Sequence, residues 1–194
     1  TFDAYGRMWV VEMRAFMPNV DGKGEEARTG RVGVLEDTNG DGRMDKRTDF
    51  LTGLQMPRAI SLVKGGVLVA EPPMLWFCED TDGDLKADKK TPVLKNYGSQ
   101  GPVEHTDNGL ILGLDNWLYN AKSTKRLRFV DGKWVLNNTR SRGQWGITQD
   151  NYGRIYYNNN SNPLYGDLIA GHYSVRNPNH SSPHGVNVPF FNER

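Results

Sequence analysis

The apolar positions of this chain fall in short runs that are separated by Gly, Asp and Asn turns. Four stretches share an apolar run, a tight turn and a second apolar or aromatic run: 2–12, 60–71, 104–119 and 146–157. Such runs on both sides of turn residues are typical of paired antiparallel strands. No window keeps apolar residues at helical spacing over three turns, which argues against long amphipathic helices. The pattern therefore predicts an all-β fold.

Two repeats along the chain favour a β-propeller. The hairpin pattern recurs at irregular intervals around the roughly 40–50 residue period of propeller blades. An acidic turn segment begins at Asp37 and again 43 residues later at Asp80. These spacings are compatible, so we expect about four blades, and a fragment whose remaining blades lie beyond both ends. The expected blades cover residues 1–52, 53–100, 101–143 and 144–194.

Composition and charge narrow the classes of function. The 22 Gly and 10 Pro suit many short strands and tight turns. The 24 basic and 23 acidic residues nearly balance, so charge gives no reason to expect nucleic acid or an anionic membrane as partner. No apolar run approaches the roughly 18 residues of a membrane-spanning helix. The single cysteine, Cys78, can form no internal disulfide, and its apolar neighbours predict a buried, inert thiol.

Two acidic loops have the residue types of a calcium site. The first carries side-chain oxygens at positions 1, 3, 5 and 9 of a calcium-loop pattern, from Asp37, Asn39, Asp41 and Asp45. The second has the same spacing in Asp80, Asp82, Asp84 and Asp88. Calcium takes six to eight oxygen ligands, which alternating side chains on a tight loop can supply. Neither loop is flanked by a helix pattern, so these are not EF-hands. We expect calcium as a structural brace, or else solvated Asp/Gly turns.

The second loop departs from the first at its sharp turn. Gly42 stands at position 6 of the first loop, and Leu85 stands at the equivalent position of the second. A side chain at that position strains the turn, since glycine adopts the required backbone conformation most readily. The calcium prediction is therefore stronger for the first loop.

Several segments resemble known propeller families. Glu104-His105, followed by Gly109-Leu110, Gly113, Asp115 and Leu118-Tyr119, resembles the D-H-x-x-G-x-L-x-x-G-x-D-x-x-x-Y signature of quinoprotein glucose/sorbosone dehydrogenases. Residues 6–12, 35–42, 67–73 and 113–120 resemble the N-terminal propeller of PVC-type haem-binding proteins. Those proteins are often labelled membrane-bound dehydrogenases and carry a CxxCH cytochrome segment further along the chain. The likeness extends from about Phe2 to Ile169.

The resemblance implies a six-bladed propeller in a periplasmic or extracellular protein. It also implies quinone-dependent oxidation of a sugar or alcohol with pyrroloquinoline quinone (PQQ), and a cytochrome-type electron acceptor. His105 would be the general base, oriented by Glu104, and Arg176 would contact substrate and quinone. The three carboxylates of the quinone need cations, for which three residues are proposed: Arg58, Lys122 and Arg126.

Other interpretations of these residues stay open. His105 fits a structural histidine or a metal ligand as well as a base, and Trp145 fits a ring that stacks on a sugar. His172, His180 and His184 lie in a Pro-broken loop whose spacing does not favour a metal site. The alternative function is a non-catalytic, calcium-braced propeller that binds a glycan or a partner protein. A third is a calcium-loop adhesion array with both acidic loops on an exposed edge.

Overall fold

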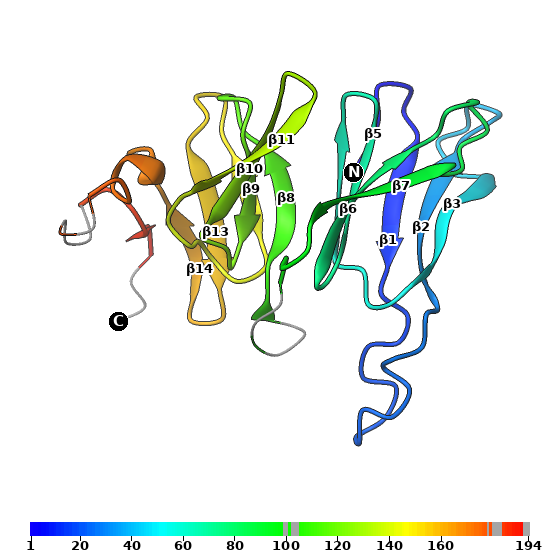
Figure 1. The fold of residues 1–194 in the computed structure, drawn as a ribbon, viewed down its shortest axis with the longest axis horizontal. Coiled ribbons are helices and arrows are strands. Elements are labelled where there is room, and N and C mark those ends of the chain that lie inside the picture. Colours follow the sequence, from blue (N-terminus) through cyan, green and yellow to red (C-terminus); the bar gives the residue numbers. More distant parts are fainter. Residues whose placement is uncertain (99–100, 102–104, 178, 180–183, 192–194) are drawn as a thin grey trace. The chain divides into compact units, whose positions relative to one another are not determined.

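The computed structural model describes residues 1–98, 101, 105–177, 179 and 184–191. Its elements within those ranges are β-strands and short 3-10 segments such as η2 (Gly171–Tyr173). The predicted all-β class is confirmed (Figure 1). No helix in the described ranges is both long enough and apolar enough to cross a membrane. The chain divides into two compact units, unit 1 (Thr1–Ser99) and unit 2 (Gln100–Arg194).

Unit 1 contains two antiparallel sheets. The first has the strand order β1-β2-β3, with bounds β1 (Met8–Glu12), β2 (Gly30–Glu36) and β3 (Lys46–Leu54). The second has the order β4-β5-β6-β7, with bounds β4 (Ala59–Val63), β5 (Gly66–Glu71), β6 (Met74–Glu79) and β7 (Lys89–Leu94). In both sheets, strands that are neighbours in sequence pair with each other. An isolated bridge, Phe2↔Met8, adds a first short pairing ahead of β1.

The core of unit 1 is shared by its two sheets. The cluster of buried side chains comes from five strands and comprises Trp9, Val32, Val34, Phe50, Leu54, Val67, Val69 and Cys78. On β5 the residues that alternate with this set, Leu68 and Ala70, are also fully buried. A strand covered on both faces reads as a continuous apolar run, as β5 does. Burial raises the pKa of the Cys78 thiol to about 12, which agrees with an inert cysteine.

Unit 2 also contains two antiparallel sheets. The first has the order β11-β10-β9-β8, with bounds β8 (Asn108–Leu112), β9 (Leu118–Ala121), β10 (Lys125–Val130) and β11 (Lys133–Asn138). The second has the order β12-β13-β14-β15, with bounds β12 (Ile147–Gln149), β13 (Ile155–Asn159), β14 (Asn162–Gly166) and β15 (Val188–Pro189). Their shared core cluster is aromatic and consists of Trp117, Tyr119, Ile155 and Tyr157.

Three of the four hairpins expected from the sequence are present as strand pairs. They are β4–β5, β8–β9 and β12–β13. The first expected hairpin, over residues 2–12, is reduced to the Phe2↔Met8 bridge, and β1 pairs along its length with β2.

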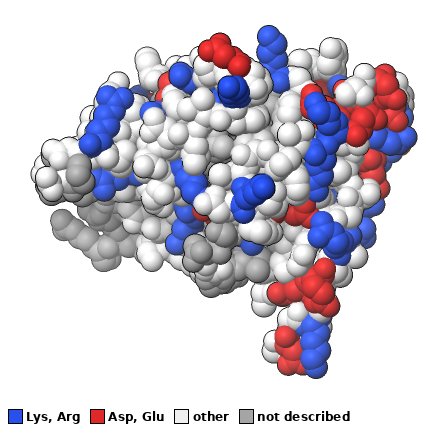
Figure 2. All heavy atoms as spheres, in the orientation of Figure 1, with Lys and Arg blue, Asp and Glu red and all other residues white. Residues whose placement is uncertain are grey.

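The connection between β1 and β2, residues 13–29, is a long surface loop with several charged residues. It extends away from the sheet (Figure 1), and it carries both acidic and basic side chains (Figure 2). The Asn19 side chain fixes the turn near its tip: its Oδ1 accepts hydrogen bonds from the backbone N–H groups of Asp21 and Lys23. A loop of this kind needs no core of its own.

Candidate functional site

Unit 2 contains a partly open cavity of about 460 Å³, called the unit 2 cavity below. It is lined by three segments and two single side chains: 113–115, 152–155, 167–173, Tyr119 and Arg142. The first two segments are the turns of the β8–β9 and β12–β13 hairpins, and the third follows β14 and includes η2. A cavity of this size is within the range of small-molecule sites.

An aspartate fixes each of the two hairpin turns at the cavity. Asp115 Oδ1 accepts a hydrogen bond from the N–H of Trp117 at 3.2 Å, and Asn116 adopts a positive φ of 61°. Asp150 Oδ1 accepts from the N–H groups of Tyr152 at 2.9 Å and Arg154 at 3.0 Å. Asp and Asn close turns of this kind through their own side chains. The turn geometry therefore sets the positions of Leu114 and Tyr152 at the cavity.

A buried ion pair lies in the wall of the cavity. Arg142 Nε is 2.6 Å from Asp167 Oδ2, and the two side chains are only 2% and 4% exposed. Arg142 Nη1 also donates to Thr139 Oγ1 at 3.0 Å, and the Tyr157 hydroxyl donates to Asp167 Oδ1 at 2.7 Å. Burial and the Asp167 carboxylate raise the pKa of Tyr157 far above its ordinary value. Both charges are thus paired and hydrogen-bonded, which a buried pair requires.

A second polar group joins Asp115, Tyr119 and Arg126. The Tyr119 hydroxyl donates to Asp115 Oδ2 at 2.6 Å, and Arg126 Nη1 donates to the Tyr119 hydroxyl at 3.3 Å. The same Nη1 lies 3.7 Å from Asp115 Oδ2, and the guanidinium stacks 4.1 Å from the centre of the Trp117 ring. Burial and the bond to Asp115 raise the pKa of Tyr119 to about 12, against the effect of Arg126. Tyr119 is therefore a hydroxyl at neutral pH.

His172 of η2 is the histidine that lines the cavity. It is half-buried, and its ring centre lies 4.3 Å from that of Tyr173. Burial lowers the pKa of the imidazole below its ordinary value. The guanidinium groups of Arg126, Arg176 and Arg142 lower this pKa further. The carboxylate of Asp115 opposes them. The neutral imidazole is therefore the dominant form at neutral pH.

The rim of the cavity is mostly apolar or aromatic, and it also includes the partly exposed side chains of Asp115 and Arg154. Five of its side chains are exposed by about half or more: Leu114 64%, Tyr152 83%, Leu168 51%, Ile169 48% and Tyr173 62%. These residues line the same cavity as the charged and hydroxyl groups of Arg142, Asp167 and Tyr119. Apolar surface beside a few convergent polar groups is the usual character of a ligand site.

The residues predicted as catalytic lie in different surroundings. Glu104 lies outside the described residues. His105 precedes β8 and packs against Trp145, with ring centres 5.6 Å apart. Arg176 stacks over the Tyr173 ring at 4.8 Å, and so borders the rim of the unit 2 cavity. Their proposed roles in oxidation stay predictions.

The three cations predicted for the quinone are divided between the units. Arg58 belongs to unit 1, where its N–H donates to the carbonyl of Ala70 at 2.9 Å. Lys122 is exposed in unit 2, with its N–H 2.7 Å from the carbonyl of Arg142. Arg126 is buried beside Asp115 and Tyr119, as described above. Of the three, Arg126 is the one that acts electrostatically on His172.

Most of the cavity's polar residues were not singled out from the sequence. Arg142 and Asp167 belong to no motif, Tyr119 entered only as a position of the dehydrogenase-like signature, and His172 entered only as an unfavourable metal ligand. A weak signal existed at Asp115, which stands in a recognisable turn. Arg142 and Asp167 are 25 residues apart in irregular segments, so only the fold brings them together.

The two acidic loops have the same hydrogen-bond pattern. In the first, between β2 and β3, Asp37 accepts from the N–H groups of Gly40 at 2.7 Å and Gly42 at 2.8 Å. In the second, between β6 and β7, Asp80 accepts from Gly83 at 2.7 Å and Leu85 at 2.9 Å. The backbone N–H of Gly42 is the largest of several contacts that hold the pKa of Asp37 below its usual range.

Leu85 adopts the strained conformation that its place in the loop requires, with φ at 63°. Gly42 has a φ of 85° at the equivalent position. The Leu85 side chain packs against the core cluster of unit 1, and this burial offsets the cost of the positive φ. The expected strain is thus present and compensated.

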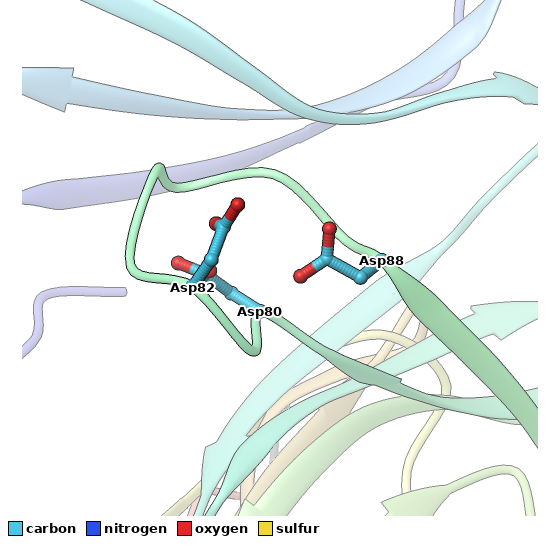
Figure 3. Close-up of side chains that lie close together, drawn as sticks. All are labelled: Asp80, Asp82 and Asp88. Atoms are coloured by element: carbon cyan, nitrogen blue, oxygen red, sulfur yellow. The ribbon is translucent and has the colours of Figure 1, made fainter.

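Three carboxylates converge in the second loop (Figure 3). Oxygen atoms of Asp80, Asp82 and Asp88 lie within 4.8 Å of one another. Asp84 instead pairs with Lys86 at 2.9 Å. In the first loop Asp45 accepts from the N–H and hydroxyl of Thr38, as Asp88 does from Thr81 in the second. Exposed acidic groups often cluster without a metal, so calcium at both loops stays a prediction.

Comparison with known proteins places the chain in one family. The family described as "Domain of unknown function (DUF7133)" matches residues 1–192. No curated protein matches the chain.

Proposed function

We propose that this chain, which belongs to the DUF7133 family, is a sugar-binding domain whose ligand occupies the unit 2 cavity. The observation that carries this proposal is the combination, in one cavity of about 460 Å³, of a mostly apolar rim and a hydrogen-bonding wall. The alternative of a glycan-binding propeller, raised by the sequence, is thus the one that this cavity supports best.

The chemistry of a sugar matches both parts of the cavity. A sugar presents apolar C–H groups on its ring faces and hydroxyls around its edge. The exposed rings of Tyr152 and Tyr173 can cover a ring face. Arg142, Asp115 and the hydroxyl of Tyr119 offer donors and acceptors in fixed positions. Fixed polar groups orient such a ligand at little entropic cost.

We also propose that the four sheets are propeller blades. Each is an antiparallel meander formed by one continuous stretch of chain, which is how blades are built. The acidic loops precede the last strand of both unit 1 sheets, at β2–β3 and β6–β7. The aspartate-fixed turn recurs at Asp3, Asp115 and Asp150, ahead of β1, β9 and β13. Repeated devices at equivalent strands support repeated units.

Oxidation with a bound quinone is the second activity that the resemblance implies, and it stays a prediction. Such a cofactor supplies hydride acceptance when it is bound, and its three carboxylates require cations around it. Of the cations predicted for it, Arg126 is buried against Asp115 and Tyr119, and Lys122 is exposed. Arg126 is thus already engaged with Asp115 and Tyr119, and no step of the proposed function passes through the quinone.

A matched pair of tyrosines tests the sugar site. Tyr152 and Tyr5 are each 83% exposed and occupy the same place in an aspartate-fixed turn, but only Tyr152 lines the cavity. Calorimetric titration of the 194-residue chain with glucose, galactose, mannose and glucuronate should show saturable binding of at least one of them. Tyr152→Ala should weaken that binding roughly fivefold or more, by loss of a ring contact of about 1 kcal/mol or more. Tyr5→Ala should leave it unchanged.

Two results would contradict the proposal. One is the absence of binding by all four sugars, and the other is equal weakening by the two alanine variants. Dye reduction by the same sugars, with and without added PQQ, tests the quinone prediction separately. Turnover that depends on PQQ and is lost in His105→Gln would establish it.

A further inference from the structure

We infer that the sugar bound in the unit 2 cavity carries an anionic substituent, which lies between Arg142 and His172. This inference rests on the proposed sugar site and names its ligand more closely. The anionic substituent is a carboxylate or a sulfate, and the two are distinguished by experiment below.

The guanidinium of Arg142 has capacity left for a ligand. Its hydrogen bonds to described residues use Nε, which donates to Asp167, and Nη1, which donates to Thr139 and the carbonyl of Arg140. Nη2 lies against Gly171, where a Cβ would come within 2.8 Å of it. Glycine at this position therefore leaves Nη2 the room that a side chain would take. A guanidinium held by two of its nitrogens presents the third in a fixed direction.

Among the described residues, the charges at this wall have a positive excess. The positive charges are the guanidiniums of Arg126, Arg142 and Arg176. The negative charges are the carboxylates of Asp115 and Asp167. Arg142 and Asp167 neutralise each other at 2.6 Å, whereas Arg126 and Asp115 are 3.7 Å apart and the Asp115 side chain is 43% exposed. Arg176 forms no ion pair with any described carboxylate, and its contact is with the Tyr173 ring. An anion placed here meets a net attraction.

Two further arginines near the cavity, Arg154 and Arg140, leave the net charge of this wall positive. Arg154 lines the cavity and is paired with Asp150 at 2.7 Å. Arg140 adds another cation beside η2, with its Nε 2.8 Å from Ser174 Oγ. The positive excess is therefore a property of the whole wall rather than of one residue.

His172 responds to the same charges. Its pKa is lowered by burial and by three guanidiniums, so the imidazole is neutral where an ordinary histidine would be partly protonated. An anion bound beside it would offset the guanidiniums and raise the pKa. The complex would then hold a proton that the free protein lacks, and binding would strengthen as the pH falls through the range where His172 titrates.

The test is calorimetric titration of the 194-residue chain with glucose, glucuronate and glucose 6-sulfate at pH 6.0 and pH 7.5. An anionic sugar should bind roughly tenfold or more tightly than glucose, as expected for a charge-assisted hydrogen bond. Which of the two anionic sugars binds more tightly identifies the substituent. The preference should increase at pH 6.0, and this increase should disappear in His172→Gln.

A charge-removal pair separates the cavity from general electrostatics. Arg176→Gln should reduce the ratio of the anionic-sugar affinity to the glucose affinity roughly two- to fivefold. Lys133→Gln, which removes one exposed positive charge from β11, should leave this ratio unchanged. Equal affinities for glucose and both anionic sugars would overturn this inference and leave the sugar site standing. If the native chain bound none of these sugars, both this inference and the proposed sugar site would be overturned.

Discussion

The guanidinium of Arg142 and the carboxylate of Asp167 form an ion pair 2.6 Å long with side chains that are almost completely buried. The pair joins the loop before β12 to the segment that follows β14. Asp167 also accepts hydrogen bonds from the Tyr157 hydroxyl at 2.7 Å and the Asn187 N–H at 3.1 Å. The same contact thus holds together the cavity wall and the chain that leads into β15.

Removing one member of this pair should destabilise the protein strongly. Asp167→Asn leaves the Arg142 charge buried without its partner, at an expected cost of about 3–5 kcal/mol in the free energy of unfolding. Urea denaturation followed by tryptophan fluorescence measures this change. Arg154→Gln is the control, because its exposed pair with Asp150 is worth only about 0–1 kcal/mol. Similar decreases in the free energy of unfolding for the two variants would show that the buried pair stabilises the fold no more than the exposed pair.

The Asp3 carboxylate should contribute to stability in a pH-dependent way. Burial raises its pKa, but hydrogen bonds from Trp9 Nε1 and from Arg7 outweigh this and lower the pKa from 3.8 to about 2. A group with a lowered folded-state pKa stabilises the fold above its unfolded value, and this stabilisation is lost as the pH falls from about 4 toward 2. Asp3→Asn should therefore lower the unfolding temperature at pH 7 more than at pH 2.5. Equal losses at both pH values would contradict the shift.

Calcium should stabilise unit 1 if the acidic loops bind it. Addition of calcium to chelator-treated protein should raise the unfolding temperature, since an ion that binds only the folded state stabilises it by mass action. Asp88→Asn, which weakens the group of three carboxylates in the second loop, should reduce this rise. Asp131→Asn, in the exposed turn between β10 and β11, should leave it unchanged. No effect of calcium on the native protein would favour solvated turns.

The sequence predicts strands and turns well because their signals are local. The apolar runs at 60–71 and 146–157 correspond to hairpins, since alternation and turn residues determine pairing between adjacent segments. The acidic loops were recognised for the same reason, and Leu85 shows why a local departure need not abolish a turn. Its partly buried side chain packs against the core cluster of unit 1, which a loop pattern alone does not reveal.

The candidate site was predictable only in part because its residues are assembled by tertiary contacts. Asp115 belongs to a visible turn, but Arg142 lies in an irregular segment and His172 in the short 3-10 segment η2, and neither segment has a periodic pattern. Their importance depends on burial and on the charges around them, which are properties of the fold. The resemblance directed attention to His105, whereas the cavity of unit 2 is lined by His172.

Sugar binding in the unit 2 cavity is tested most directly by nuclear magnetic resonance mapping of the binding surface. The isotope-labelled 194-residue chain is titrated with glucose and with glucuronate, and backbone amide shifts are followed for both units. We predict saturable shift changes concentrated at residues 113–115, 152–155 and 167–173, the segments that line the cavity. Shift changes confined to other surfaces, or none at saturating concentrations of either sugar, would contradict the proposed function.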